Sequence, residues 1–283
     1  MKIIVNKENK LLEYLYENLD MPKKRVKQYL THGSIYVNNS KVTQFDYKVV
    51  PGMTIIIDTD NKNKKTLPFD VVFEDDHIIV VNKPSGLLTI ATEKEKEKTL
   101  YHIAREYLVS KDKYAKVFIV HRLDKDTSGI VVLAKDMKTK NMLQENWNEF
   151  VSLREYVAVV HGKLKNKEDK IIQRLKENKA NIVYVSKDDD AKEAITNYKV
   201  IKETDNYSMV SINIETGRKN QIRVAFATLR NPIVGDKKYG DSKEKESRLY
   251  LHANRLKMYY PILKKDILFE IPTPNEFKKI MNK

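Results

Sequence analysis

The apolar residues of this chain fall mainly into short runs that alternate with dense polar segments. Two runs, Val117–Val120 and Ile130–Ala134, have the length and the β-branched content of buried strands. Residues 69–73 and 78–81 form a second pair of expected strands, joined by a short acidic turn. Further strands are expected over residues 154–162, 194–202 and 207–214.

Apolar residues at helical spacing predict one helix over residues 100–108 and another over residues 137–150. Asp136 is placed to cap the start of the second helix. Trp147, the only tryptophan, lies on the inward side of that helix, so we expect a core residue rather than a platform for stacked bases. A further helix is expected near residues 221–224.

Residues 1–60 are expected to form a small module of their own. Leucines at helical spacing predict a helix over residues 9–18, and Pro22 favours the start of a second helix. The polar and basic segment 61–67 has the composition of a linker. The strand-rich region 68–283 is therefore predicted to be a second and larger domain.

The first turn of the second predicted helix carries Lys23, Lys24 and Arg25. Cations at this end oppose the helix dipole and each cost a few tenths of a kcal/mol, roughly. A phosphate bound at the same end would reverse the sign of that effect. The residues alone leave two interpretations open, a phosphate-binding surface and an ordinary solvated basic face.

Charge and composition narrow the classes of partner. Lys and Arg number 53 and Asp and Glu number 39, a net charge of +14, which favours a polyanionic partner, RNA or DNA before a membrane. Cysteine is absent and no metal-binding or nucleotide-binding pattern occurs, so we expect neither a metal nor a cofactor. No apolar run approaches the ~20 residues of a membrane span, and charges interrupt the N-terminal segment, so we expect a cytoplasmic protein.

A polar connection, residues 121–129, joins the first two predicted strands. Within it Asp124 follows a cation, Arg122, and an apolar residue, Leu123. A carboxylate that stays ionised and partly dehydrated at such a position serves as a nucleophile or a general base. The other interpretation is a turn in which the aspartate caps the backbone and Thr-Ser-Gly closes the loop, and the residue types alone favour it.

The string His-Arg-Leu-Asp-Lys-Asp-Thr-Ser-Gly at 121–129 resembles the signature of the RluA-type pseudouridine synthases, HRLD, two variable positions and TSG. The resemblance implies that Asp124 is the catalytic aspartate and that Asp126 is a solvated loop carboxylate. Residues 154–162 resemble the tyrosine-containing strand of the same family, which implies that Tyr156 is the active-site tyrosine.

Two further segments resemble this family. Residues 82–88 are similar to its NKPxG segment, and residues 216–240 to its TGRxHQ(I/L)RxH…PIxGDxxYG segment. The second similarity assigns Arg223 to the catalytic site and Arg218 to RNA binding. Asn220 and Ala225 stand where the family often has histidines, and this departure is expected to alter local RNA contacts or loop hydrogen bonds. The late histidine His252 is expected to be structural.

The N-terminal module is similar to the S4 RNA-binding domain in its basic helix 22–31, the following Gly33 and the turn Pro51-Gly52. The residues implied to face RNA phosphates are Lys23, Lys24, Arg25 and Lys27. Together the two resemblances imply an α+β protein: an S4-like domain, then a mixed, mostly antiparallel sheet with helices and loops around a central cleft. The strand-rich order with few βαβ alternations agrees with that class.

The implied activity is the isomerisation of uridines in structured RNA, which requires no metal, cofactor or ATP. We expect Asp124 to act at the ribose, paired with Arg223, while Tyr156 packs on the base and Arg122 fills the space that the uridine leaves. Large-subunit ribosomal RNA is the first expected substrate and tRNA the second, with a monomer as the default state.

Two other hypotheses stay open. A nucleoside glycosidase would also place a carboxylate at the ribose, and Asp124 with Asp126 provides the pair that it uses. A non-catalytic S4-type RNA-binding or ribosome-assembly protein would account for the charge and for the N-terminal module.

Overall fold

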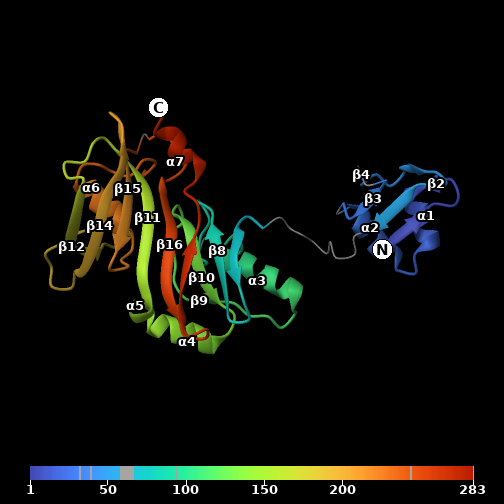
Figure 1. The fold of residues 1–283 in the computed structure, drawn as a ribbon, viewed down its shortest axis with the longest axis horizontal. Coiled ribbons are helices and arrows are strands. Elements are labelled where there is room, and N and C mark those ends of the chain that lie inside the picture. Colours follow the sequence, from blue (N-terminus) through green and yellow to red (C-terminus); the bar gives the residue numbers. More distant parts are fainter. Residues whose placement is uncertain (32, 39, 58–66, 94, 243, 283) are drawn as a thin grey trace. The chain divides into compact units, whose positions relative to one another are not determined.

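The computed structural model describes residues 1–31, 33–38, 40–57, 67–93, 95–242 and 244–282. The chain divides into two compact units, Met1–Thr66 and Leu67–Lys283 (Figure 1). The predicted linker 61–67 lies outside the described residues except for Leu67. Each unit is described by itself.

The first unit combines two short helices with a small antiparallel sheet in the order β1-β6-β3-β4. The elements are β1 (Lys2–Ile4), β2 (Asn9–Lys10), α1 (Leu11–Asn18), α2 (Lys23–Thr31), β3 (Ile35–Val37), β4 (Ser40–Lys41), β5 (Lys48–Val49) and β6 (Thr54–Ile57). Val26, Tyr29 and Leu30 of α2 are buried, as their helical spacing requires. Gly33 follows α2 with φ of +65°, a conformation that favours glycine at a helix C-terminus.

The second unit is built on one large sheet in the order β13-β12-β14-β15-β11-β16-β10-β8-β7, with β17 beside β16 and β9 beside β10 (Figure 1). The strands are β7 (Asp70–Glu74), β8 (Ile78–Lys83), β9 (Phe118–Ile119), β10 (Ser128–Ala134), β11 (Val151–His161), β12 (Glu168–Glu177), β13 (Val183–Val185), β14 (Lys192–Glu203), β15 (Tyr207–Ile214), β16 (Leu251–Tyr260) and β17 (Lys265–Glu270). Within the described residues, the pairing of β10 with β16 is parallel and the other strand pairings of this sheet are antiparallel. The predicted mixed, mostly antiparallel sheet is confirmed.

The helices of the second unit pack on this sheet and around its ends. They are α3 (Leu100–Lys111), α4 (Met137–Glu145), α5 (Trp147–Phe150), α6 (Gln221–Thr228) and α7 (Asn275–Ile280). Asp136 caps α4 as expected, because its carboxylate accepts the Thr139 N–H at 2.7 Å. The helix expected over residues 137–150 is divided at Asn146, where α4 ends and α5 begins.

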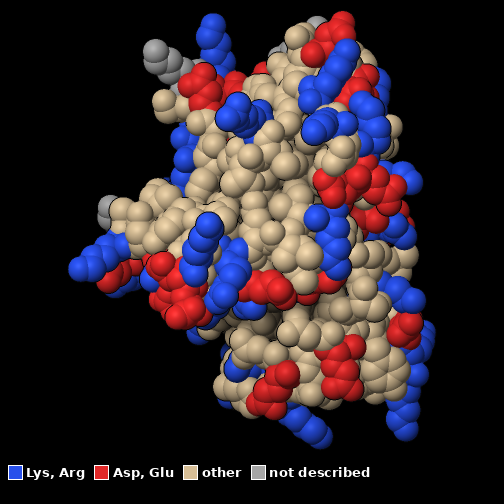
Figure 2. All heavy atoms as spheres, turned by 90° about the vertical axis from the view of Figure 1, so that its left-hand side faces the viewer, with Lys and Arg blue, Asp and Glu red and all other residues tan. Residues whose placement is uncertain are grey.

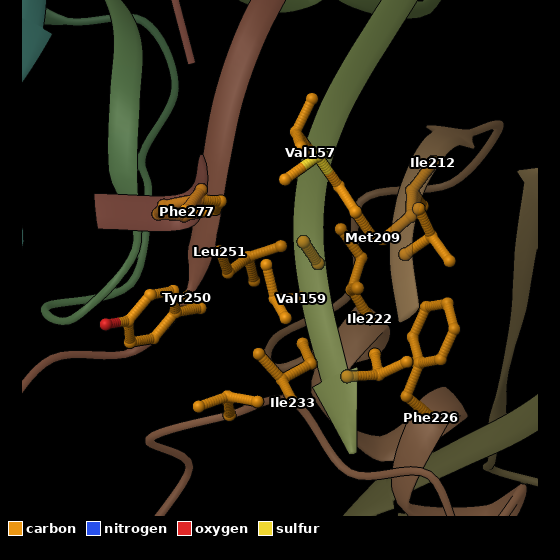
Figure 3. Packing of buried hydrophobic residues seen from close by; sticks show 14 of the residues in the cluster. Val157, Val159, Met209, Ile212, Ile222, Phe226, Ile233, Tyr250, Leu251 and Phe277 are labelled. Carbon is orange, nitrogen blue, oxygen red and sulfur yellow. The ribbon is translucent and has the colours of Figure 1, made fainter. Parts of the chain in front are cut away.

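The largest core cluster lies between the strands β11 and β15 and the helix α6 (Figure 3). Ile212 of β15 lies on the face of the sheet that Ile222 and Phe226 of α6 cover, whereas Val157 and Val159 of β11 lie on the opposite face. All five side chains are buried, which ties α6 to the centre of the sheet. Burial of these apolar faces therefore fixes the helix that presents Arg223.

The parallel contact between β10 and β16 is short and close. Ser128 pairs with His252, and Gly129 pairs with Ala253. Gly129 has φ of +123°, and a Cβ atom there would lie 2.2 Å from the Ala253 carbonyl oxygen. The glycine of the Thr-Ser-Gly sequence is therefore required by the approach of β16.

One face of this unit carries charged side chains of both signs. On the face near β12 and α6, basic and acidic side chains are interspersed (Figure 2). Binding of a polyanion therefore depends on local groups of cations rather than on one uniform face.

Candidate active site

The connection 121–129 lies between β9 and β10 and is fixed by buried polar contacts from residues 83–89. Lys83, which is fully buried, donates its ammonium hydrogens to the carbonyl oxygens of Pro84, Leu87 and Lys125 at 2.8–3.0 Å. The Ser85 hydroxyl donates to the Asp126 carbonyl at 2.6 Å. These contacts explain why an Asn-Lys-Pro-Ser-Gly sequence accompanies the aspartate loop: it holds the loop backbone in one conformation.

The charge on Lys83 also belongs to the electrostatics of the loop. Burial lowers the pKa of Lys83 to about 7, while the carboxylates of Asp126 and Asp124 act to raise it. The two aspartates therefore stabilise the charged form of Lys83. The sequence alone assigns no role to Lys83; the available signal is a lysine that lies between the buried strand 78–81 and a proline.

Asp124 faces a hollow of about 450 Å³ at the centre of the second unit. Arg122, Tyr156, Arg218 and Arg223 line the same hollow. The structure thus brings together all five residues that the sequence assigned to this part of the site. Asp124 itself is half-buried, which suits a carboxylate that must react yet stay ionised.

Tyr156 projects from β11 into this hollow. Burial raises the pKa of Tyr156 to about 12; the Arg154 guanidinium opposes the rise and the charge of Asp124 adds to it. Tyr156 is therefore a neutral phenol at physiological pH, and its O–H is available as a hydrogen-bond donor.

Arg223 pairs with Asp236 and not, as predicted, with Asp124. Its Nε and a terminal nitrogen donate to the two carboxylate oxygens of Asp236 at 2.8 and 2.7 Å, whereas no ion pair within 4.0 Å joins it to Asp124. The reason is that the Asp236 side chain is fully buried, and a buried carboxylate requires a paired cation. Burial of Arg223 acts to lower its pKa, but Asp236, with smaller contributions from Asp124 and Asp126, raises it.

Asn220 takes part in the same network. It lies at the start of α6 with φ of +54°, and its amide donates to the Tyr239 hydroxyl at 3.0 Å and accepts from Arg223 at 3.3 Å. The Tyr239 hydroxyl also accepts the Val183 N–H at 3.0 Å, which connects β13 to the site. Ala225, the other departure from the family pattern, is a buried apolar residue of α6.

The basic residues assigned to the first unit lie along α2. Lys23, Lys24, Arg25 and Lys27 are all exposed. The Lys23 ammonium lies 5.3 Å from the Tyr16 ring centre, and the Arg25 guanidinium lies 5.8 Å from that of Tyr29. Among the described residues, none of the four lysines and arginines forms an ion pair within 4.0 Å with a carboxylate. They are therefore available to an anionic partner.

The described residues contain neither a candidate metal site nor a candidate membrane-spanning helix. Three or more histidine or acidic side chains do not come together anywhere in a geometry suited to a metal ion. Among the same residues, no helix has both the length and the apolar character needed to cross a membrane.

Comparison with solved structures identifies the fold. Human RNA Pseudouridylate Synthase Domain Containing 4 superposes with a TM-score of 0.64 at 24% sequence identity, covering 76% of this chain and 92% of that one. Human RNA Pseudouridylate Synthase Domain Containing 1 gives a TM-score of 0.58 at 19% identity, covering 78% and 97%. The second unit therefore has the fold of a pseudouridylate synthase domain.

Sequence comparisons identify the family. The RNA pseudouridylate synthase family matches residues 77–228. Ribosomal large subunit pseudouridine synthase D of Buchnera aphidicola is 32% identical over 283 residues, covering 91% of this chain and 88% of its own. An uncharacterized RNA pseudouridine synthase of Bacillus subtilis, YhcT, is 29% identical over 290 residues, covering 99% and 96%. The chain belongs to the RNA pseudouridine synthase family and is an isomerase.

Proposed function

We propose that this enzyme converts uridines of structured RNA to pseudouridine with Asp124 acting at the ribose. The observation that carries the proposal is the shared hollow in which Asp124 faces Tyr156 and is surrounded by arginines. A carboxylate, a neutral phenol and several cations suit a reaction that changes charge on a sugar and moves a proton on a base.

In the proposed reaction the bond between C1′ and N1 breaks, the uracil turns, and a new bond joins C1′ to C5. Asp124 either attacks C1′ or stabilises the sugar cation while a neighbouring proton is removed. The C5 proton then leaves and N1, freed from the sugar, takes up a proton, so atoms and charge balance without a cofactor. Tyr156 packs against the base and relays a proton through its hydroxyl group, which its raised pKa keeps protonated.

Arg223 takes a different place from the direct partner first expected for Asp124. It is fixed by Asp236 and contributes positive potential to the hollow that contains Asp124. This arrangement places a positive charge near the catalytic carboxylate without occupying the oxygen that must reach the ribose. Arg122, exposed beside the aspartate, fills the space that the extruded uridine leaves in the RNA.

The proposed substrate is large-subunit ribosomal RNA, with tRNA second. Relatives named for the ribosomal large subunit support this order. We assign residues 1–60 to an S4-like RNA-binding domain in which Lys23, Lys24, Arg25 and Lys27 contact phosphates, and residues 68–283 to catalysis. We further propose that the enzyme acts in the cytoplasm as a monomer. Extruding a uridine costs a few kcal/mol, roughly, which phosphate contacts offset.

Tritium release from RNA carrying 5-tritiated uridine tests the proposal, because the new bond at C5 expels that hydrogen. We expect release by the wild type from unmodified large-subunit ribosomal RNA, and a loss of at least about a thousandfold in Asp124→Asn, which removes the reacting charge. Asp126→Asn is the matched control on the same loop and should retain most of the rate.

Turnover by Asp124→Asn at the wild-type rate would remove Asp124 from the mechanism. Free uracil in place of pseudouridine would instead establish a glycosidase. Tight binding of both large-subunit ribosomal RNA and tRNA, without release of tritium from either, would indicate a non-catalytic RNA-binding protein.

A further inference from the structure

A second hollow of about 410 Å³ adjoins the one that contains Asp124. The two share Arg122, Tyr156 and Arg218, while His121, Trp147 and Arg154 line the second alone. Resting on the function proposed above, we propose that this second hollow binds the RNA nucleotide next to the target uridine. Its base packs against His121 and Trp147, and its phosphate pairs with Arg154.

The aromatic wall has a fixed geometry. The rings of His121 and Trp147 are stacked, with centres 4.5 Å apart and planes inclined by 30°. The His121 Nε2 accepts the Val132 N–H at 3.0 Å, which fixes the orientation of the imidazole. Burial lowers the pKa of His121 to about 3, so the ring is neutral at physiological pH. Such a surface suits a nucleobase, since every base has a face that stacks.

Trp147 therefore has two roles in the fold. It packs against the core cluster that contains Leu143, as its helical spacing predicted. It is nevertheless only half-buried, and it lines the hollow together with Gln144 of α4 and Asn148 of α5. The amides of Gln144 and Asn148 supply a donor and an acceptor at the edge of a stacked base, where sequence preference arises.

Arg154 supplies the anion-binding part of the site. It is half-buried, and its guanidinium donates to the backbone carbonyl of Glu215. Within the described residues, neither Arg154 nor its neighbours Arg122 and Arg218 have a carboxylate oxygen within 4.0 Å. Arg255 in the same hollow is different, because it pairs with Glu155 at 3.2 Å.

An arginine that is half-buried without a carboxylate is costly unless an anion completes the site. A phosphate oxygen matches the forked donors of a guanidinium. Arg154, Arg122 and Arg218 together surround the boundary between the two hollows. A phosphodiester that links the target uridine to its neighbour would lie at this boundary.

The single tryptophan makes the inference directly measurable. We would titrate the full-length protein with a short single-stranded oligouridylate and follow the fluorescence of Trp147. We expect saturable quenching, weakened roughly tenfold in Arg154→Gln. Arg105→Gln, which removes an exposed arginine of α3, is the matched control and should bind like the wild type. Asp124→Asn should keep the quenching, because the second hollow does not contain Asp124.

Steady-state tritium release separates a binding role from a structural one. Trp147→Leu should raise KM roughly tenfold with kcat changed by less than about twofold, and Trp147→Phe should restore most of the affinity because it restores a ring. Unquenched fluorescence at saturating RNA, or unchanged KM in both Arg154→Gln and Trp147→Leu, would overturn the inference. Saturable quenching without tritium release from any RNA would overturn the proposed function and leave the nucleotide site standing.

Discussion

At the scale of single residues, the site depends on charges that are buried with their partners. Asp236 and Arg223 form a bidentate pair, and the Asp236 carboxylate also accepts the backbone N–H groups of Lys238 and Tyr239 at 3.0 Å. The pair places a cation near Asp124 without a direct contact. Buried pairs of this kind are more costly to break than to replace as a whole.

Asp236→Asn should therefore destabilise the protein strongly. It leaves the guanidinium of Arg223 buried with no anion, and we expect a loss of about 3 kcal/mol in the free energy of unfolding. Urea unfolding followed by circular dichroism measures the loss. Asp266→Asn breaks the exposed pair with Lys257 and should cost less than about 1 kcal/mol. Equal losses in the two variants would contradict this account of Asp236.

His252 makes stability depend on pH. Burial and the nearby Arg248 lower its pKa to about 4, from 6.5. Below pH 6.5 the unfolded chain binds a proton that the folded chain refuses, so stability falls as the pH decreases from 6.5 to 4. The loss from this group alone reaches about 2 kcal/mol at pH 5.

Urea unfolding at pH 7.5 and pH 5.0 measures this loss. In His252→Gln the difference between the two pH values should shrink, because the titrating group is gone. His121, with a pKa of about 3, also makes the folded state less stable at low pH, so part of the pH difference should remain in His252→Gln. Burial acts to raise the pKa of Glu74, but hydrogen bonds from Lys135 and Lys111 hold it at about 2. Its stabilisation of the folded state is therefore lost only as the pH falls below 4.5. If His252→Gln leaves the difference in the free energy of unfolding between pH 7.5 and pH 5.0 unchanged, His252 is not the source of that difference.

At the scale of elements, the sequence predicted the parts whose signals are local. The apolar runs at 78–81 and 130–134 form the buried strands β8 and β10, and Asp136 caps its helix as expected. The division of that helix at Asn146 carries no clear local signal. The partner of Arg223 was mispredicted because Asp124 and Asp236 are both carboxylates near it in the fold, and the choice between them depends on burial.

Gly129 shows how one element constrains another. Gly129→Ala would place a Cβ atom 2.2 Å from a backbone oxygen of Ala253, and neither strand is free to move. We expect a loss of at least about 3 kcal/mol, since overpacking adds to an unfavourable φ. Gly86→Ala is the matched control: its φ is +84° but nothing lies within 4 Å of the added atom, so it should cost only about 1–2 kcal/mol. Thermal unfolding of both variants measures the two losses, and equal decreases in Tm would refute the steric explanation.

At the scale of the whole molecule, the chain combines two units that have separate cores. Among the residues that the structure describes, the buried cluster of the first unit ends at Ile57 and those of the second unit begin at Phe69. Each unit thus buries its own apolar surface, which is the basis for independent folding. Under the function proposed above, the first unit contributes RNA affinity and the second contributes the chemistry.

Salt dependence of RNA binding tests that division. Lys24→Gln in α2 should weaken binding and reduce the slope of log K against log salt concentration by about 1, because one phosphate contact is lost. Lys278→Gln, which removes an exposed lysine of α7, is the control and should leave the slope unchanged. Filter binding at several salt concentrations gives both values. An unaltered slope in Lys24→Gln would remove that residue from the RNA contact surface.

The short parallel contact between β10 and β16 has a consequence for how the enzyme is made. The Ser128 hydroxyl and the His252 ring are 124 positions apart in sequence and 2.9 Å apart in space. The aspartate loop enters β10 at this point, so its final support arrives only when residues near 252 have left the ribosome. A nascent or truncated chain that ends before β16 would have Asp124 in place in the sequence but not in the structure. We therefore expect activity only after β16 has been synthesised and has left the ribosome.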